Sequence, residues 1–133
     1  MNPRHPQVSL RAGNRCEYCH APALVFNFLF EVEHITPLAR EGTDHTLNLA
    51  LACRACNAHK AARLEGVDPE QGIAVRLFHP RRDVWEHHFR VEIETAQIVG
   101  VTAEGRATVA CLDMNNPIQR SARRYWLQSG LFP

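Results

Sequence analysis

The first half of the chain alternates between apolar stretches and polar breaks in a way that predicts a small mixed structure. Segment 24–34 is rich in β-branched and aromatic residues, which predicts extended strands ending at Pro37. Residues 40–46 are polar and indicate a loop, and a short apolar stretch follows at 48–52. The alanine- and charge-rich segment 54–64 predicts a helix. The expected order is therefore strand, strand, helix.

The second half begins with a segment that lacks a clear pattern. Residues 66–83 carry Pro69, Gly72 and Pro80, and we expect an irregular connector there. Segments 85–94 and 97–101 are typical of two strands around a polar turn, which predicts a short β-hairpin.

Two helices are expected after the hairpin. Thr102 is a suitable cap for a helix over 103–114. Asn116 followed by Pro117 predicts the start of a second helix, because an asparagine cap and a first-turn proline both favour helix initiation, and Gly130 closes it. The fold class expected for the whole chain is α+β.

Length and composition indicate one ordinary globular unit of 133 residues with 45% hydrophobic content. We expect a module at 1–66, with its core at 15–64, and an extension at 67–133 that packs on it. The formal charge of +1 does not point to any class of partner. The amino terminus lacks the apolar core of a signal peptide and no stretch reaches the ~20 apolar residues of a membrane span, so a cytoplasmic protein is expected, with no membrane partner.

Four of the five cysteines form two C-x-x-C pairs. Each pair can place two sulfurs on one ion, and two pairs make the tetrahedral four-sulfur site that structural zinc prefers. Disulfides and a redox-active pair are the alternatives, and a reducing cytosol favours metal binding over disulfides. The expected zinc ligands are Cys16, Cys19, Cys53 and Cys56. Cys111 lies in an apolar run and is expected to be a buried apolar residue.

Residues 16–60 resemble the four-cysteine subclass of the HNH endonuclease family. The resemblance rests on C-E-Y-C, V-E-H-I-T-P-L and N-L-A-L-A-C-R-A-C-N-A-H-K, which occur here in that order and cover about a third of the chain. It implies a ββα-metal module held together by a four-cysteine zinc site, and a metal-dependent endonuclease that hydrolyses DNA phosphodiester bonds by nicking or by double-strand cleavage.

The resemblance also implies a role for each matched residue. His34 would be the general base that activates water, a task suited to imidazole at neutral pH. Glu33 and Asn57 would bind one catalytic Mg²⁺ or Mn²⁺ ion. Asn48 would hold the loop and orient the base. His59 is a spare candidate for the site.

Several basic residues are candidate phosphate contacts. Lys60 and Arg63 lie on the predicted helix after the second cysteine pair. In the last helix an apolar face is expected to dock on the domain, while three arginines on the opposite face remain in solvent: Arg120, Arg123 and Arg124. A solvated helix face explains these residues equally well.

The sequence leaves some alternatives open. A zinc-stabilised module that binds nucleic acid without cleaving it would have the same fold. RNA instead of DNA is also compatible with this chemistry, and the sequence does not determine the oligomeric state.

Overall fold

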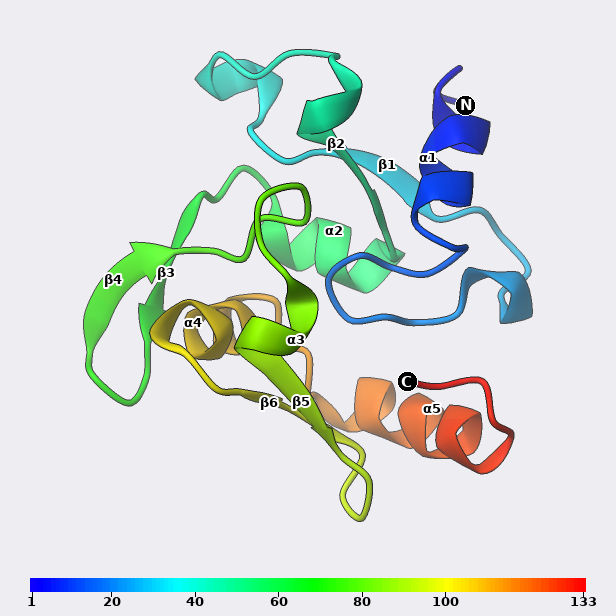
Figure 1. Ribbon diagram of the computed structural model, residues 1–133, viewed down its shortest axis with the longest axis vertical. Coiled ribbons are helices and arrows are strands. Elements are labelled where there is room, and N and C mark those ends of the chain that lie inside the picture. Colours follow the sequence, from blue (N-terminus) through cyan, green and yellow to red (C-terminus); the bar gives the residue numbers. More distant parts are fainter.

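The computed structural model describes residues 1–133, and its elements alternate between short helices and short hairpins (Figure 1). The helices are α1 (His5–Arg11), α2 (Arg54–Lys60), α3 (Trp85–His88), α4 (Ala103–Cys111) and α5 (Pro117–Gln128). The strands are β1 (Glu31–His34), β2 (Leu49–Ala52), β3 (Glu65–Asp68), β4 (Ile73–Arg76), β5 (Phe89–Glu92) and β6 (Gln97–Gly100). The strands form three separate antiparallel pairs, β1 with β2, β3 with β4 and β5 with β6.

The first pair and the helix after it form a ββα unit. Glu31 is opposite Ala52 and His34 is opposite Leu49, and α2 begins directly after β2. The expected order of strand, strand, helix and the α+β class are thus confirmed. The strands are shorter than predicted, because residues 23–25 form a 3-10 turn and only β1 comes from the aromatic segment.

Helix α1 was not predicted from the sequence. It has proline in its first turn, and Val8 is its one buried residue. It packs on β1 and β2, and Arg11 donates hydrogen bonds to the carbonyl oxygens of Thr46 and Leu49. These contacts explain why a short polar segment is helical, since packing and not propensity stabilises it.

The expectation of an irregular connector at 66–83 was wrong for its first part. Strands β3 and β4 form a hairpin whose turn contains Gly72 at φ +70°, a conformation that favours glycine. The hairpin packs on α4. Arg106 of α4 donates to both carboxylate oxygens of the fully buried Asp68, at 2.9 and 2.8 Å. The pattern of prolines and glycines marked the turn but concealed the strands.

The β5–β6 hairpin is present, but residues 85–88 form the helical turn α3 and not the start of a strand. In this turn the indole of Trp85 donates to the carbonyl oxygen of Tyr18 at 2.8 Å. Its ring also stacks on His20, with ring centroids 4.0 Å apart. The first cysteine knuckle, 16–20, is therefore covered by the extension.

Helices α4 and α5 start at the predicted caps. The Thr102 hydroxyl accepts from the Gly105 amide, and the Asn116 side chain accepts from the Gln119 amide. Helix α4 ends at Cys111, three residues before the predicted end at 114. The Cys111 side chain is partly exposed, although the sequence predicted a buried apolar residue.

The orientation predicted for α5 holds only in part: Trp126 of the expected apolar face packs against the core, but other residues of that face do not. Ile118 and Tyr125, expected to dock on the domain, are 81% and 67% exposed, whereas Arg123 is fully buried. The arginine side chain points inward because it satisfies carbonyl groups that precede the helix. Arg123 donates to the carbonyl oxygens of Ala96 and Met114.

One continuous apolar cluster spans both halves of the molecule. It includes Val8 and Leu51 from the first half and Phe78, Phe89 and Phe132 from the second. None of the helices combines the length and apolar character needed to cross a bilayer.

Candidate functional site

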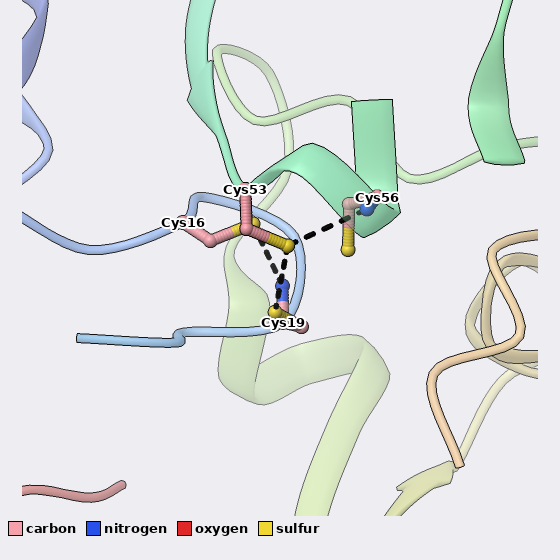
Figure 2. A group of neighbouring side chains, drawn as sticks. All are labelled: Cys16, Cys19, Cys53 and Cys56. Atoms are coloured by element: carbon pink, nitrogen blue, oxygen red, sulfur yellow. Dashed lines mark hydrogen bonds between the residues drawn. The ribbon is translucent and has the colours of Figure 1, made fainter. Parts of the chain in front are cut away.

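The two cysteine pairs converge on one point in the interior (Figure 2). Cys16 and Cys19 come from the turn before the ββα unit, and Cys53 and Cys56 come from the start of α2. The four sulfurs lie within 4.8 Å of one another and all four residues are buried. The two pairs are thus positioned to bind a metal ion.

The geometry of the cluster fits a zinc-sized ion. The sulfurs of Cys19 and Cys53 are 3.7 Å apart, close to the ~3.8 Å edge of a tetrahedron with ~2.3 Å Zn–S bonds. The amides of Cys19 and Cys56 point at the sulfurs of Cys16 and Cys53, at 3.5 and 3.4 Å. These local hydrogen bonds fold each C-x-x-C turn around the sulfur of its first cysteine. Each turn therefore supplies two of the four sulfurs of the site.

The close approach of the thiols also indicates a need for a cation. Hydrogen bonds with neighbouring thiols raise the pKa values of Cys19 and Cys56 well above the usual range of a thiol, and the bond with Cys16 has the largest effect. The same type of bond lowers the pKa of Cys53. Four thiolates this close would repel one another, so a bound dication is what allows all of them to ionise together.

His34 ends β1 at the rim of the ββα unit. Its Nε2 lies 2.7 Å from Oδ1 of Asp44, with 22% of the His34 side chain and 71% of the Asp44 side chain exposed. Asp44 lies in the loop that connects β1 to β2, and no sequence pattern indicated this partnership. The pair places an imidazole at the surface with one nitrogen held by a carboxylate.

Asn48 ties that loop together. Its Oδ1 accepts from the Thr36 amide at 2.8 Å, and its Nδ2 donates to the carbonyl oxygens of Thr36 and Thr43. Gly42 is required in the same loop, because a Cβ there would lie 1.8 Å from the Thr36 carbonyl oxygen. The loop that carries Asp44 is therefore closed by its own side chain and backbone bonds.

The comparison with protein families agrees with this geometry. Residues 16–63 match the HNH endonuclease family model. The chain contains an HNH domain. No curated protein and no solved structure matches the chain. The HNH domain indicates a nuclease-type function, and nucleic acid is the partner that such a function requires.

Glu33 lies on the inner face of the HNH domain, 5% exposed. One carboxylate oxygen pairs with the Lys60 ammonium at 2.6 Å, and the other accepts from the Tyr18 hydroxyl at 2.5 Å. Burial is the main cause that raises the pKa of Glu33, and the Lys60 charge opposes it. Both carboxylate oxygens are thus occupied, and this arrangement does not fit the expected ligation of a catalytic ion by Glu33.

Lys60 is 1% exposed and also donates to the carbonyl oxygen of Ile35 at 2.8 Å. Its expected phosphate contact is incompatible with this burial. The reason is that Lys60 lies at the end of α2, where the helix meets β1, so the side chain completes the interior of the HNH domain.

Asn57 is half-buried on α2, and its side chain makes no hydrogen bond to the protein. His59, the spare candidate, is tied to its own helix, with Nδ1 2.8 Å from the Ala55 carbonyl oxygen. Of the two, Asn57 keeps a free amide that is available to a ligand.

The remaining basic candidates divide by exposure. Arg63 is exposed, although one guanidinium nitrogen bonds the His59 carbonyl oxygen, and Arg124 is exposed on α5. Arg120 is half-buried and donates to the carbonyl oxygen of Thr95. The predicted three-arginine patch is wrong because Arg123 is buried and Arg120 is engaged.

Proposed function

We propose that this protein is a metal-dependent HNH endonuclease that hydrolyses DNA phosphodiester bonds, with His34 as the general base. The observation that carries the proposal is the hydrogen-bonded pair of His34 and Asp44 at the exposed edge of the HNH domain. A general base must reach the substrate, which requires an exposed histidine, and it must keep one defined tautomer, which requires a hydrogen-bond partner. His34 meets both requirements.

Asp44 acts as a positioning residue for His34. A carboxylate accepts only, so the Nε2 that faces it carries the proton and Nδ1 keeps its lone pair. Nδ1 is then the atom that takes the proton of the attacking water. The negative charge of Asp44 stabilises the imidazolium that forms, and Asn48 maintains the pair by closing the loop between them.

Two kinds of metal belong to the proposal. We infer that the four-cysteine site holds structural zinc, whose ligand set and spacing it fits. A catalytic Mg²⁺ or Mn²⁺ ion would supply charge stabilisation at the scissile phosphate when bound. Asn57 is the residue that would hold it, because its amide oxygen is free and oxygen ligands suit such ions.

The test is the cleavage of supercoiled plasmid by the purified protein, with and without added Mg²⁺ or Mn²⁺. We expect metal-dependent nicking or linearisation, and a loss of about 100-fold or more for His34→Ala, since general-base catalysis contributes roughly that much. Asp44→Asn is expected to lose about 10-fold or more, as outer-shell partners of histidine do. His87→Ala, at an exposed histidine of α3, is the matched control and should keep wild-type activity.

Nicking by His34→Ala within a few-fold of wild type would remove His34 from this role. The melting transition and zinc content of each variant should equal those of wild type, because neither His34 nor Asp44 contacts the cysteine cluster.

A second candidate is a zinc-stabilised module that binds nucleic acid without cleaving it. The engagement of Glu33 by Lys60 and Tyr18 favours this candidate, since it removes one expected ligand of the catalytic ion. Metal-independent binding of labelled DNA, with no cleavage in either metal, would support it over the nuclease. Parallel assays with RNA decide the class of nucleic acid.

A further inference from the structure

We propose that the cavity between the HNH loop, residues 35–48 between β1 and β2, and the turn at residues 79–83 is a binding site for a phosphate group of the nucleic-acid backbone, separate from the scissile phosphate. This inference rests on the proposed nuclease function for the source of that phosphate. It assigns to the extension a direct role in holding substrate.

The cavity has a volume of about 440 Å³ and adjoins the loop that carries Asp44. Leu47 is the one hydrophobic residue of its lining, and Glu41 is the one acidic residue. The HNH loop contributes His45 and Thr43, and the turn contributes His79, Arg81 and Arg82. A cavity of this size has room for a hydrated phosphodiester group, and most residues of its lining are polar or charged.

Both histidines are fixed as hydrogen-bond donors toward a ligand. The Nδ1 atom of His45 accepts from the Leu47 amide, and the Nδ1 atom of His79 accepts from the Arg81 amide, each at 3.1 Å. A neutral ring that accepts at Nδ1 carries its proton at Nε2. Burial lowers the pKa of His79, which keeps that ring neutral. The histidines of the lining therefore donate, which suits an oxyanion.

The two arginines add cationic donors. Arg82 is exposed and has no acidic partner. Arg81 pairs with Glu17 through one guanidinium nitrogen, while its Nε is buried without any hydrogen-bond partner. That Nε is closed off from the cavity, so Arg81 contributes positive charge to the lining and the free cationic donors come mainly from Arg82. Arginine is the residue best suited to phosphate recognition.

The turn is rigid before any ligand binds. The amides of Arg82 and Asp83 donate to the His79 carbonyl oxygen, and the His79 amide donates to the Asp83 carboxylate. That carboxylate is held by two hydrogen bonds from Arg76, at 2.6 and 3.0 Å. The donors of the turn are thus preorganised, which reduces the entropy cost of binding.

The experiment compares Arg82→Ala with Arg90→Ala, an exposed arginine on β5 whose only acidic neighbour is 3.9 Å away. Arg82 contributes only its backbone amide to the turn, so alanine preserves the fold. The first measurement is the affinity for a labelled DNA duplex at about 50 and 200 mM salt. We expect Arg82→Ala to bind more weakly and with a log–log salt slope shallower by about 0.9. Over this range the affinity of wild type would then fall about 3.5-fold more than that of the variant. Arg90→Ala should match wild type.

The second measurement uses inorganic phosphate and the side-chain NMR resonances of His45 and His79. Phosphate should shift both in wild type and in Arg90→Ala, but not in Arg82→Ala. If phosphate shifts the histidine resonances but Arg82→Ala does not change the DNA affinity or its salt slope, the cavity binds free phosphate and does not contact the DNA backbone. Unchanged resonances together with an unchanged slope for Arg82→Ala would overturn the site.

The phosphate site and the nuclease activity can be present independently of each other. A protein that cleaves plasmid but shows no Arg82 effect is a nuclease without this site. A protein that never cleaves, yet shows the Arg82-dependent slope and shifts, has the site without the nuclease activity.

Discussion

In the HNH domain the buried cation Lys60 is neutralised by Glu33, whereas in the extension the buried cation Arg123 is held by carbonyl groups without any carboxylate. Each region must compensate for a charge that has been removed from water, and the two regions do so in different ways. The cysteine cluster links them, because attraction to the sulfurs of Cys19, Cys56 and Cys53 opposes the lowering of the Arg123 pKa by burial.

The two regions also differ in what stabilises them. The HNH domain depends on a metal and on one internal ion pair, since a unit of fewer than ~70 residues rarely gains enough stability from an apolar core alone. The extension depends on capped helices, hairpins, hydrogen bonds to backbone carbonyl groups and the pair of Arg106 and Asp68. A zinc ion with four thiolates carries a net charge of about −2, so metal binding would also stabilise the arginine of the other region.

The largest expected effect is the loss of the metal. Replacing Cys53 and Cys56 together by alanine, or removing metal with a strong chelator, should unfold the HNH domain, because structural zinc supplies about 10–16 kcal/mol of apparent binding free energy. Elemental analysis and NMR spectra measure metal content and fold. Cys111→Ala is the matched control, since Cys111 is outside the cluster and should keep one zinc per chain. Retention of the fold in the double variant would contradict the metal dependence of this region.

The next effect concerns the ion pair of the HNH domain. Glu33→Gln or Lys60→Met should each lower the free energy of unfolding by about 3–5 kcal/mol, because the remaining charge is buried without a partner. Urea unfolding of the zinc-loaded protein measures this loss. Combining Glu33→Leu with Lys60→Met should recover much of it. If Glu33→Gln instead keeps full stability and loses only cleavage, Glu33 is a metal ligand and not a structural partner of Lys60.

A smaller effect is expected for the buried cation of the extension. Arg123→Met should lower the free energy of unfolding by about 2–4 kcal/mol, because the carbonyl groups of Ala96 and Met114 lose their donors. Arg124→Met, at the exposed neighbouring position, should change it by no more than about 0.5 kcal/mol. Equal values for the two variants would show that the buried arginine is not a stabilising element.

The smallest effect is a pH dependence located in the extension. The hydrogen bonds from Arg106 lower the pKa of Asp68 below its usual value. The folded state therefore binds this proton less readily than the unfolded chain, so the stabilisation is present above the unfolded pKa of about 3.9 and is lost as the pH falls through the folded pKa.

Arg106→Ala should be less stable than wild type at neutral pH, and the difference should shrink as the pH falls below about 4. Both proteins share the same cysteine cluster, so acid release of metal affects them equally. A difference that stays constant with pH would assign the Arg106 effect to packing alone.

The accuracy of the sequence predictions follows the range of the interactions involved. The two halves of the metal cluster and the helix starts at Thr102 and Asn116 were predicted well, because each depends on residues within three positions of one another. The hairpin at 65–76 and helix α1 were missed. Their stability comes from packing against α4 and against β1 and β2, and no local pattern reports such contacts.

The sequence by itself determined the chemistry that this chain can offer: two cysteine knuckles, a histidine at the end of a strand and asparagines placed to hold the loop and the site. Only the tertiary structure decided which charged groups meet ligands and which complete the interior. Lys60 and Arg123 are typical surface residues in sequence, but segments distant along the chain provide their acceptors. The roles of Asp44 and of the turn at 79–83 also depended on the tertiary structure, since their partners are distant in sequence or converge only in the folded chain.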